Sequence, residues 1–215
     1  MNNIIFITGT NTGVGKTYFL CKILEYIYTF FPNLKPKVIG YKLIETGVEN
    51  FPEDALKISK VMGKYLPPVY TFKYPLSPYD AANLEGRKIF KKVLLEKLKK
   101  LSQSYFLVFV EGAGGIEVPI FPYYTFLDFI KEFNLKTILV SPNKLGTIND
   151  TLLSSRAIDK NLLGIYFNKV DENLASTVNI KTINLFLKKK YNLSPFISDS
   201  IEKFARFILK EVLWT

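Results

Sequence analysis

The chain contains no histidine, and Cys21 is its single cysteine. These absences exclude a disulfide framework, a zinc centre, and the serine–histidine or cysteine–histidine pairs that serve nucleophilic catalysis. Any chemistry must therefore use lysine, carboxylate, hydroxyl and backbone amide groups. Cys21 falls within a helical pattern, where we expect a packed residue with no chemical role.

Long hydrophobic runs are also missing. None approaches the roughly 18 uninterrupted apolar residues that cross a membrane. The first apolar stretch, Ile4 to Thr8, is too short for a signal peptide and lacks its basic flank. We therefore expect a cytoplasmic protein with no membrane partner. A length of 215 residues with 48% hydrophobic content predicts one domain over residues 1–215.

Acidic residues are fewer than basic ones, 19 against 29, which gives a net charge of +10. Such an excess can indicate a nucleic-acid partner. However, the lysines between residues 88 and 100 alternate with apolar residues, as on the solvated face of a helix. We favour the solvated face and expect no nucleic-acid partner.

Short apolar runs bounded by turn residues recur along the chain, with helical patterns between them. Runs of this kind are typical of parallel strands buried on both faces. They predict a doubly wound α/β fold: a mostly parallel sheet in three layers, with helices on both faces and ligands at the carboxyl ends of the strands. After Pro195 we expect a short sixth strand or loop and a final helix, Ile201 to Leu213. The five runs are Ile4–Thr8, Lys37–Leu43, Phe106–Val110, Lys136–Val140 and Leu163–Phe167.

The first run leads into Gly-Thr-Asn-Thr-Gly-Val-Gly-Lys-Thr, residues 9–17. A glycine-rich loop between a strand and a helix, ending in Gly-Lys-Thr, is typical of a phosphate-binding loop (P-loop). The amides of Gly13, Val14 and Gly15 would bind phosphates, Lys16 would reach the β and γ phosphates, and Thr17 would bind Mg2+. Five residues separate the first glycine from Gly15, one more than in the standard Walker pattern. The alternative is a glycine-rich turn that caps a helix.

Three charged residues follow the later strands. Lys42 would face the same crevice as Lys16 and could stabilise charge on a transferring phosphoryl group, although lysines at strand ends are often only surface charges. Glu111 follows a very apolar run, where a carboxylate is costly unless it is paired or binds a metal, so we favour a metal-binding role. Asp54 lies in the first turn of a predicted helix and taken alone could be a cap.

Six motif blocks in order resemble the dethiobiotin synthetase family along most of the chain. That family has the longer loop, with Gly-Thr-Asp/Asn-Thr-x-Val-Gly-Lys-Thr. The blocks are residues 9–17, Gly40-Tyr41-Lys42 with Thr46-Gly47, Asp54-Ala55, Ser77-Pro78 with Ala81-Ala82 and Glu85-Gly86, Val110 to Gly115, and Lys144 to Asn149.

The resemblance implies a ligase that forms carbon–nitrogen bonds in biotin biosynthesis. In that family an amine of 7,8-diaminononanoate takes up CO2 as a carbamate, whose oxygen attacks the γ phosphate of MgATP. The second amine then closes the urea ring of dethiobiotin, releasing ADP and phosphate. Carried across, Lys16 and Lys42 are catalytic, Thr12, Lys42 and Thr46 bind substrate, and Mg2+ is held by Thr17, Asp54 and Glu111.

The resemblance also implies a homodimer with substrate at the subunit interface. The substrate carboxylate would lie near the Lys144 to Asp150 loop, with Gly146, Thr147 and Asn149 as contacts, although that turn could equally be a helix cap. Asn168 matches the family's adenine contact, or else is an ordinary turn residue. The segment from Ser194 to Ser198 departs from the family's usual Ile-Pro stretch.

Two other enzyme classes share this type of sheet. Partitioning and septum-site ATPases place a signature lysine early in the loop, where this chain has Thr10 and Asn11, and usually add a DNA- or membrane-binding element. Amidoligases acting on corrin precursors generally carry an extra glutamine-hydrolysing domain with a catalytic cysteine. A basic nucleic-acid-binding module would leave the residues at the strand ends unexplained.

Overall fold

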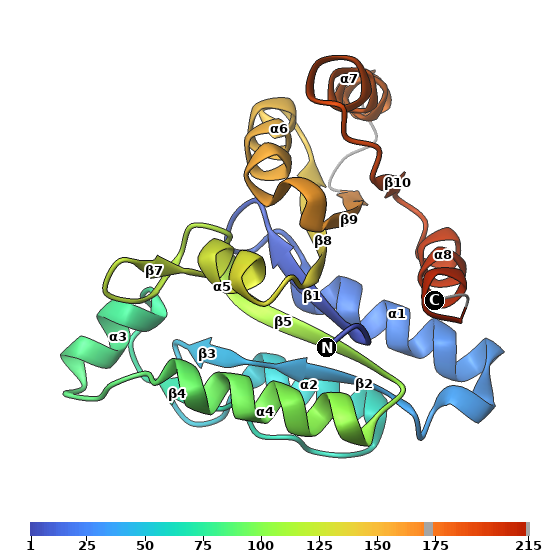
Figure 1. Cartoon of the computed structure of the whole chain (residues 1–215). Helices are drawn as coiled ribbons and strands as arrows, with labels where there is room; N and C mark the ends of the chain where they lie inside the picture. The colour runs from blue at the N-terminus through green and yellow to red at the C-terminus, as the bar shows by residue number, and fades with distance from the viewer. Residues whose placement is uncertain (170–173, 214–215) are drawn as a thin grey trace.

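The computed structural model describes residues 1–169 and 174–213. Its centre is a six-stranded sheet in the order β10-β9-β8-β1-β5-β2, in which every neighbouring pair is parallel (Figure 1). The strands are β1 (Ile4–Gly9), β2 (Val38–Lys42), β5 (Leu107–Gly115), β8 (Lys136–Asn143), β9 (Leu162–Lys169) and β10 (Phe196–Ser198). The predicted strands and their parallel arrangement are therefore confirmed.

Helices α1 (Lys16–Phe30), α2 (Glu53–Met62) and α8 (Ile201–Leu213) cover one face of the sheet. Because side chains alternate along a strand, Ile5 and Ile7 of β1 point to this face. They pack in one apolar cluster with Phe19 of α1, Ile58 of α2 and Phe204 of α8. This face holds the helices that begin next to the predicted P-loop and Asp54.

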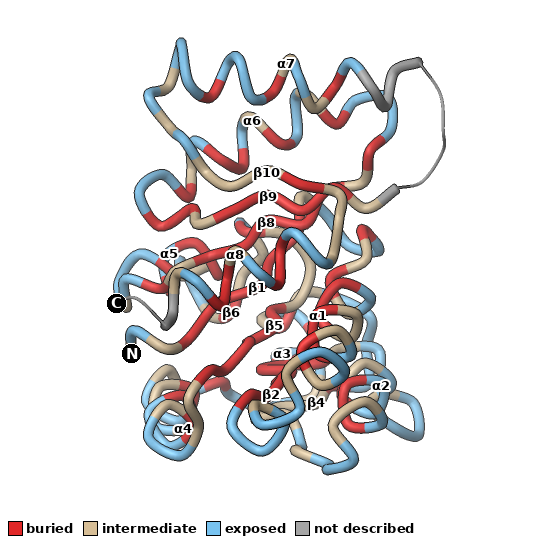
Figure 2. Tube along the Cα trace, turned by 90° about the vertical axis from the view of Figure 1, so that its right-hand side faces the viewer, coloured by how far each residue is buried: buried red, intermediate tan, exposed pale blue. Residues whose placement is uncertain are grey.

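The opposite face is covered by α4 (Lys91–Ser104), α5 (Phe126–Glu132), α6 (Thr147–Ile158) and α7 (Leu174–Tyr191). Ile4 and Phe6 of β1 point this way, and the Phe6 ring lies 5.8 Å from the ring of Phe126. Along the trace, buried residues concentrate on the strands and exposed ones on the outer sides of the helices (Figure 2). The three-layer α/β prediction is confirmed.

Three strands (β5, β8 and β9) run at least two residues beyond the carboxyl ends predicted from the sequence, and β5 and β8 extend furthest. Glu111 does not end its strand, because β5 continues to Gly115, and β8 likewise runs past Val140 to Asn143. Residues 112–115 (Gly-Ala-Gly-Gly) carry no bulky side chains, so the chain stays extended and Gly115 pairs with Gly9 at the start of the P-loop. Glu111 therefore sits inside the sheet, level with Lys42 of β2.

Small elements at the edges were not anticipated from the apolar pattern. A parallel pair, β3 (Ile44–Thr46) and β4 (Tyr70–Phe72), lies beyond β2, and an antiparallel hairpin joins β6 (Pro119–Phe121) to β7 (Tyr124–Thr125). Helix α3 (Pro78–Leu84) and the short 3-10 turns η1 (Pro32–Leu34) and η2 (Asp159–Asn161) complete the described chain. Within the described residues, no helix has both the length and the apolar character to cross a membrane.

Candidate nucleotide and metal site

The loop between β1 and α1 has the backbone of a phosphate-binding loop. Gly13 and Gly15 adopt positive φ angles of 74° and 97°, a region that side chains with a Cβ disfavour. At Gly9 an added Cβ would meet the Val14 side chain at 2.6 Å, so glycine is required there by close packing. The Val14 side chain is buried in the core, which ties the middle of the loop to the protein.

Helix α1 begins directly at Lys16 without a side-chain cap. Its N-cap residue is Gly15, and its first turn contains no acidic residue. The first amides of a helix have no partner within the helix and carry partial positive charge. This arrangement is suited to binding an anion such as a phosphate group.

Three charged side chains and a hydroxyl meet beside this loop. Lys42 Nζ donates to Glu111 Oε1 at 2.6 Å and to Asp54 Oδ2 at 2.7 Å. The Thr17 hydroxyl donates to the same Glu111 oxygen at 2.8 Å. Lys42 and Glu111 occupy paired positions on adjacent parallel strands, so their side chains leave the sheet on the same face. Asp54 arrives from the first turn of α2 and Thr17 from the first turn of α1.

The electrostatics follow from burial and from these contacts. Burial works to lower the pKa of Lys42, but Glu111 and Asp54 outweigh it and hold the pKa above its ordinary value. Burial works to raise the pKa of Asp54, yet Lys42 and the Thr17 hydroxyl bring it below its usual range. Among the described residues, no carboxylate forms an ion pair with Lys16. Burial lowers its pKa from 10.5 to about 8, although Glu111 works in the opposite direction.

Most of the site residues named from the sequence line one cavity of about 320 Å³. Its wall also includes Tyr18, Glu45, Ala113 and Gly114, which the sequence analysis did not name. The cavity therefore combines the predicted phosphate-binding loop with two lysines and three carboxylates. The sequence-predicted residues in it are Thr12, Gly13, Gly15, Lys16, Thr17, Lys42, Thr46, Asp54 and Glu111.

The donor set fits a magnesium ion. Thr17, Asp54 and Glu111 supply only oxygen atoms, the ligands that Mg2+ prefers. Glu111 Oε2 is buried and has no hydrogen-bond partner among the described residues, which leaves an acceptor available to a cation. Among the described residues, no group of three or more histidine, cysteine or acidic side chains is placed to hold a metal ion, so a site here would need the Thr17 hydroxyl as its third donor.

Glu45 is the buried acid that the sequence analysis missed. It lies on β3 with only 5% of its surface exposed, and its carboxylate accepts the amides of Asp54 at 2.7 Å and Ala55 at 3.1 Å. Burial raises the pKa of Glu45, while these two amides oppose that change. Its position just beyond a strand end, three residues after Lys42, places it near the candidate site in the sequence, but nothing in the sequence indicates its contact with Asp54.

The predicted carboxylate-binding turn lies away from this cavity. Gly146 has a φ of 91° and precedes α6, but the buried Thr147 hydroxyl is shared with Ser141 and Thr151 inside the protein. Asn149 donates to Asp150 at 3.1 Å. Gly146 and Asn149 are exposed, and the binding roles of all three residues remain predictions.

Asn168 lies at the carboxyl end of β9 and contacts the P-loop from the other side. Its side-chain amide donates to the Val14 carbonyl at 3.2 Å, and a Cβ on Gly15 would come within 2.2 Å of it. Asn168 is therefore placed next to the predicted phosphate-binding loop. Contact with a base stays a prediction.

One motif block proves to be structural. Ser77 caps α3 by accepting the Asp80 amide, and Ala81 and Ala82 are buried against the core. Glu85 accepts the amide of Lys73, which follows β4. These contacts stabilise the β3–β4 pair, which carries Thr46, but the residues that make them do not line the cavity.

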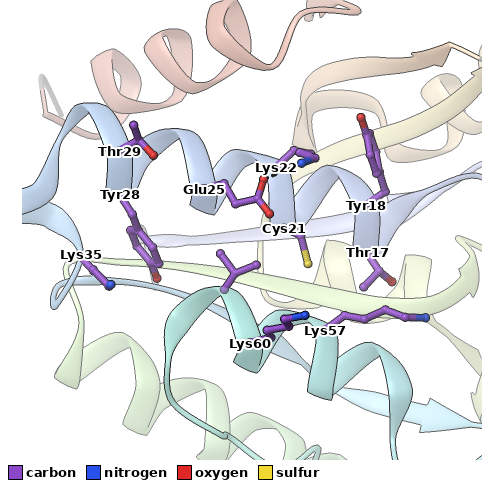
Figure 3. A pocket seen from close by; sticks show the side chains of 11 residues that line it. Thr17, Tyr18, Cys21, Lys22, Glu25, Tyr28, Thr29, Lys35, Lys57 and Lys60 are labelled. Atoms are coloured by element: carbon purple, nitrogen blue, oxygen red, sulfur yellow. Dashed lines mark hydrogen bonds and ion pairs between the residues drawn. The ribbon is translucent and has the colours of Figure 1, made fainter.

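A larger groove of about 760 Å³ runs between α1 and α2, starting at Thr17 (Figure 3). Several of its charged side chains have partners: Lys22 pairs with Glu25 at 2.7 Å, Lys57 pairs with Glu53 at 3.2 Å, and Lys35 lies 5.7 Å from the Tyr28 ring centroid. Cys21 lines the groove, and burial raises its thiol pKa to about 11, so it remains protonated at neutral pH. The smaller cavity, which holds most of the sequence-predicted residues, is therefore the candidate site.

The parallel sheet, the glycine loop at the start of α1 and the oxygen-rich cavity together define a P-loop nucleotide-binding protein. Comparison with known proteins agrees. The sequence model of a protein family described as an AAA domain matches residues 3–201. A crystal structure of a DUF1611 family protein from Anabaena variabilis shares the fold with a TM-score of 0.51 at 12% identity, covering 99% of this chain and 57% of that one.

The particular family follows from closer relatives. The chain is 39% identical over 171 residues to ATP-dependent dethiobiotin synthetase BioD 2 of Haemophilus influenzae, covering 73% of this chain and 84% of that protein. It is 37% identical over 199 residues to ATP-dependent dethiobiotin synthetase BioD of Endomicrobium trichonymphae, covering 88% and 89%. With the corresponding protein of Lysinibacillus sphaericus it shares 33% over 211 residues, covering 92% and 88%. The chain belongs to the dethiobiotin synthetase family, a family of ligases.

Proposed function

We propose that the chain converts 7,8-diaminononanoate, CO2 and ATP into dethiobiotin, ADP and phosphate in the cytoplasm. The observation that carries the proposal is the convergence of Lys16, Lys42, Thr46 and the two carboxylates Asp54 and Glu111 on one cavity. The choice of this reaction rests on membership of the dethiobiotin synthetase family. The cavity supplies side chains of the types that such a reaction needs.

The two lysines have separate parts in this proposal. Lys16 Nζ donates to the Asn11 carbonyl of the P-loop at 3.2 Å and would bind the β and γ phosphates of ATP. Lys42 lies between Asp54 and Glu111 and would carry positive charge toward the carbamate and the transferring phosphoryl group. Phosphoryl transfer depends mainly on positioning and charge stabilisation, so the reaction does not require histidine.

Mg2+ would be held by Thr17, Asp54 and Glu111. When bound, the ion would neutralise charge on the β and γ phosphates. Lys42 keeps the two carboxylates close together despite their like charge, which would reduce the cost of assembling the metal site. A Glu111→Gln variant should therefore require much more Mg2+ for turnover.

We also propose a homodimer that completes the substrate site. Three large apolar side chains support a contact surface: Tyr123, Leu145 and Leu153 are 105%, 90% and 54% exposed. Tyr123 occupies the tip between β6 and β7, and Leu145 precedes α6. The amides at Gly146 would then bind the substrate carboxylate of the neighbouring protomer. Sedimentation analysis tests this part, with a Leu145→Asp variant expected to shift the protein toward monomer.

The decisive experiment follows dethiobiotin by mass spectrometry and phosphate release in parallel. Product that forms only with MgATP, bicarbonate and the diamine together would support the reaction, and Lys16→Ala should abolish it. ATP hydrolysis indifferent to the diamine would refute the reaction and favour a switch ATPase with the same nucleotide site. Near-normal turnover by Lys16→Ala would instead refute the role of the P-loop.

A further inference from the structure

Glu45 caps a helix from a neighbouring strand. Helix α2 starts at Glu53 after Pro52, which forms no side-chain cap. The two oxygens of Glu45 instead accept the first-turn amides of Asp54 and Ala55. A carboxylate at this end of a helix also interacts favourably with the helix dipole.

The cap acts on the residue that faces the cavity. Glu45 binds the backbone amide of Asp54, and the Asp54 side chain lies 2.7 Å from Lys42 Nζ. Two hydrogen bonds to successive amides fix the position of the first turn of α2 relative to β3, and they also fix its rotation about the helix axis. The direction of the Asp54 carboxylate therefore depends on a side chain that belongs to another element.

We propose that Glu45 is a positioning residue that holds Asp54 in the geometry required for Mg2+ and nucleotide. The inference rests on the proposed function, because it assigns Asp54 to the metal. Glu45 also adjoins Thr46, so one short strand links the metal side of the cavity to its substrate side. Groups that orient metal ligands commonly change metal affinity about 10- to 100-fold when they are altered.

The test compares Glu45→Gln with the wild-type protein. Glutamine has nearly the same shape, but it accepts with only one atom and turns an N–H group toward the second amide. Binding of a non-hydrolysable ATP analogue is measured by calorimetry with EDTA and with Mg2+. We expect metal-free binding to change less than about twofold because the P-loop is untouched, and the gain in affinity from Mg2+ to fall at least about tenfold.

A matched control separates positioning from a general loss of stability. Thr125→Ala removes a comparable cap, that of α5, where the hydroxyl accepts the Asp128 amide at 3.3 Å. This variant should lose some stability but keep the full effect of Mg2+. Hydrogen exchange should speed up at residues 54 and 55 in Glu45→Gln alone. Should that variant fail to fold, Glu45→Asp, which keeps the charge but shortens the reach, provides the same comparison.

A double-variant comparison tests the route of the effect. If Glu45 acts through Asp54, Glu45→Gln combined with Asp54→Ala should bind MgATP analogue no more weakly than Asp54→Ala alone. Additive losses, or a normal Mg2+ effect in Glu45→Gln, would overturn the inference. None of these measurements needs the diamine, so a wild-type protein that binds MgATP but makes no dethiobiotin would refute the reaction without touching the Glu45 result.

Discussion

Lys16 should make nucleotide binding depend on pH in the mildly alkaline range. The side chain is 6% exposed, and burial lowers its pKa from 10.5 to about 8 in the free protein. Phosphate oxygens would favour the ammonium and return the pKa toward its ordinary value. At about 1.36 kcal/mol per pKa unit, the difference corresponds to a coupling of about 3 kcal/mol between proton and nucleotide.

Nucleotide binding should weaken as the pH rises, because the free protein loses a proton that the complex keeps. Above pH 8 the free protein loses the Lys16 proton, whereas the complex keeps it up to about pH 10.5. Binding at pH 9 should then take up about 0.9 proton, and the Kd should rise roughly tenfold between pH 7.5 and pH 9. The phosphates of ATP are already ionised over this range, so the ligand itself contributes little.

Calorimetry with the ATP analogue in two buffers of different ionisation enthalpy measures both quantities. Lys16→Arg is the control, since a guanidinium stays charged and should remove the pH dependence. A Kd that varies less than twofold, without proton uptake, would refute the argument. Equal pH dependence in Lys16→Arg would assign the proton to another group.

Two further predictions concern stability, measured by urea unfolding. Lys42→Met should lower the free energy of unfolding by about 3–5 kcal/mol, because it leaves the fully buried Glu111 without its cation. Lys57→Met removes an exposed ion pair and should change little, so equal losses would contradict the reasoning. Gly112→Ala should cost about 1–3 kcal/mol, since its Cβ would lie 2.9 Å from Phe6 Cζ, and an unchanged unfolding midpoint would argue against that clash.

The sequence alone determined the layer architecture and indicated the edge of the sheet where the candidate site lies. Buried parallel strands must be short and apolar on both faces, so their runs are visible locally and their carboxyl ends mark the ligand edge. The P-loop could also be recognised locally, because its glycines and Lys16 are consecutive in the chain. Helix Ile201–Leu213 was located correctly for the same reason, since a repeating apolar pattern marks a helix face.

Only the tertiary structure decided which distant residues meet. The pairing of β2 with β5 places Lys42 level with Glu111, 69 positions away in sequence. Because both side chains are buried, this contact keeps the pKa of Lys42 above its ordinary value. The internal hydrogen bonds of Thr147 were invisible for a similar reason, because they depend on how α6 docks onto β8. Glu45 is the clearest example: as a sequence letter it is one acid among 19, and only the approach of α2 to β3 directs its carboxylate to the amide of Asp54.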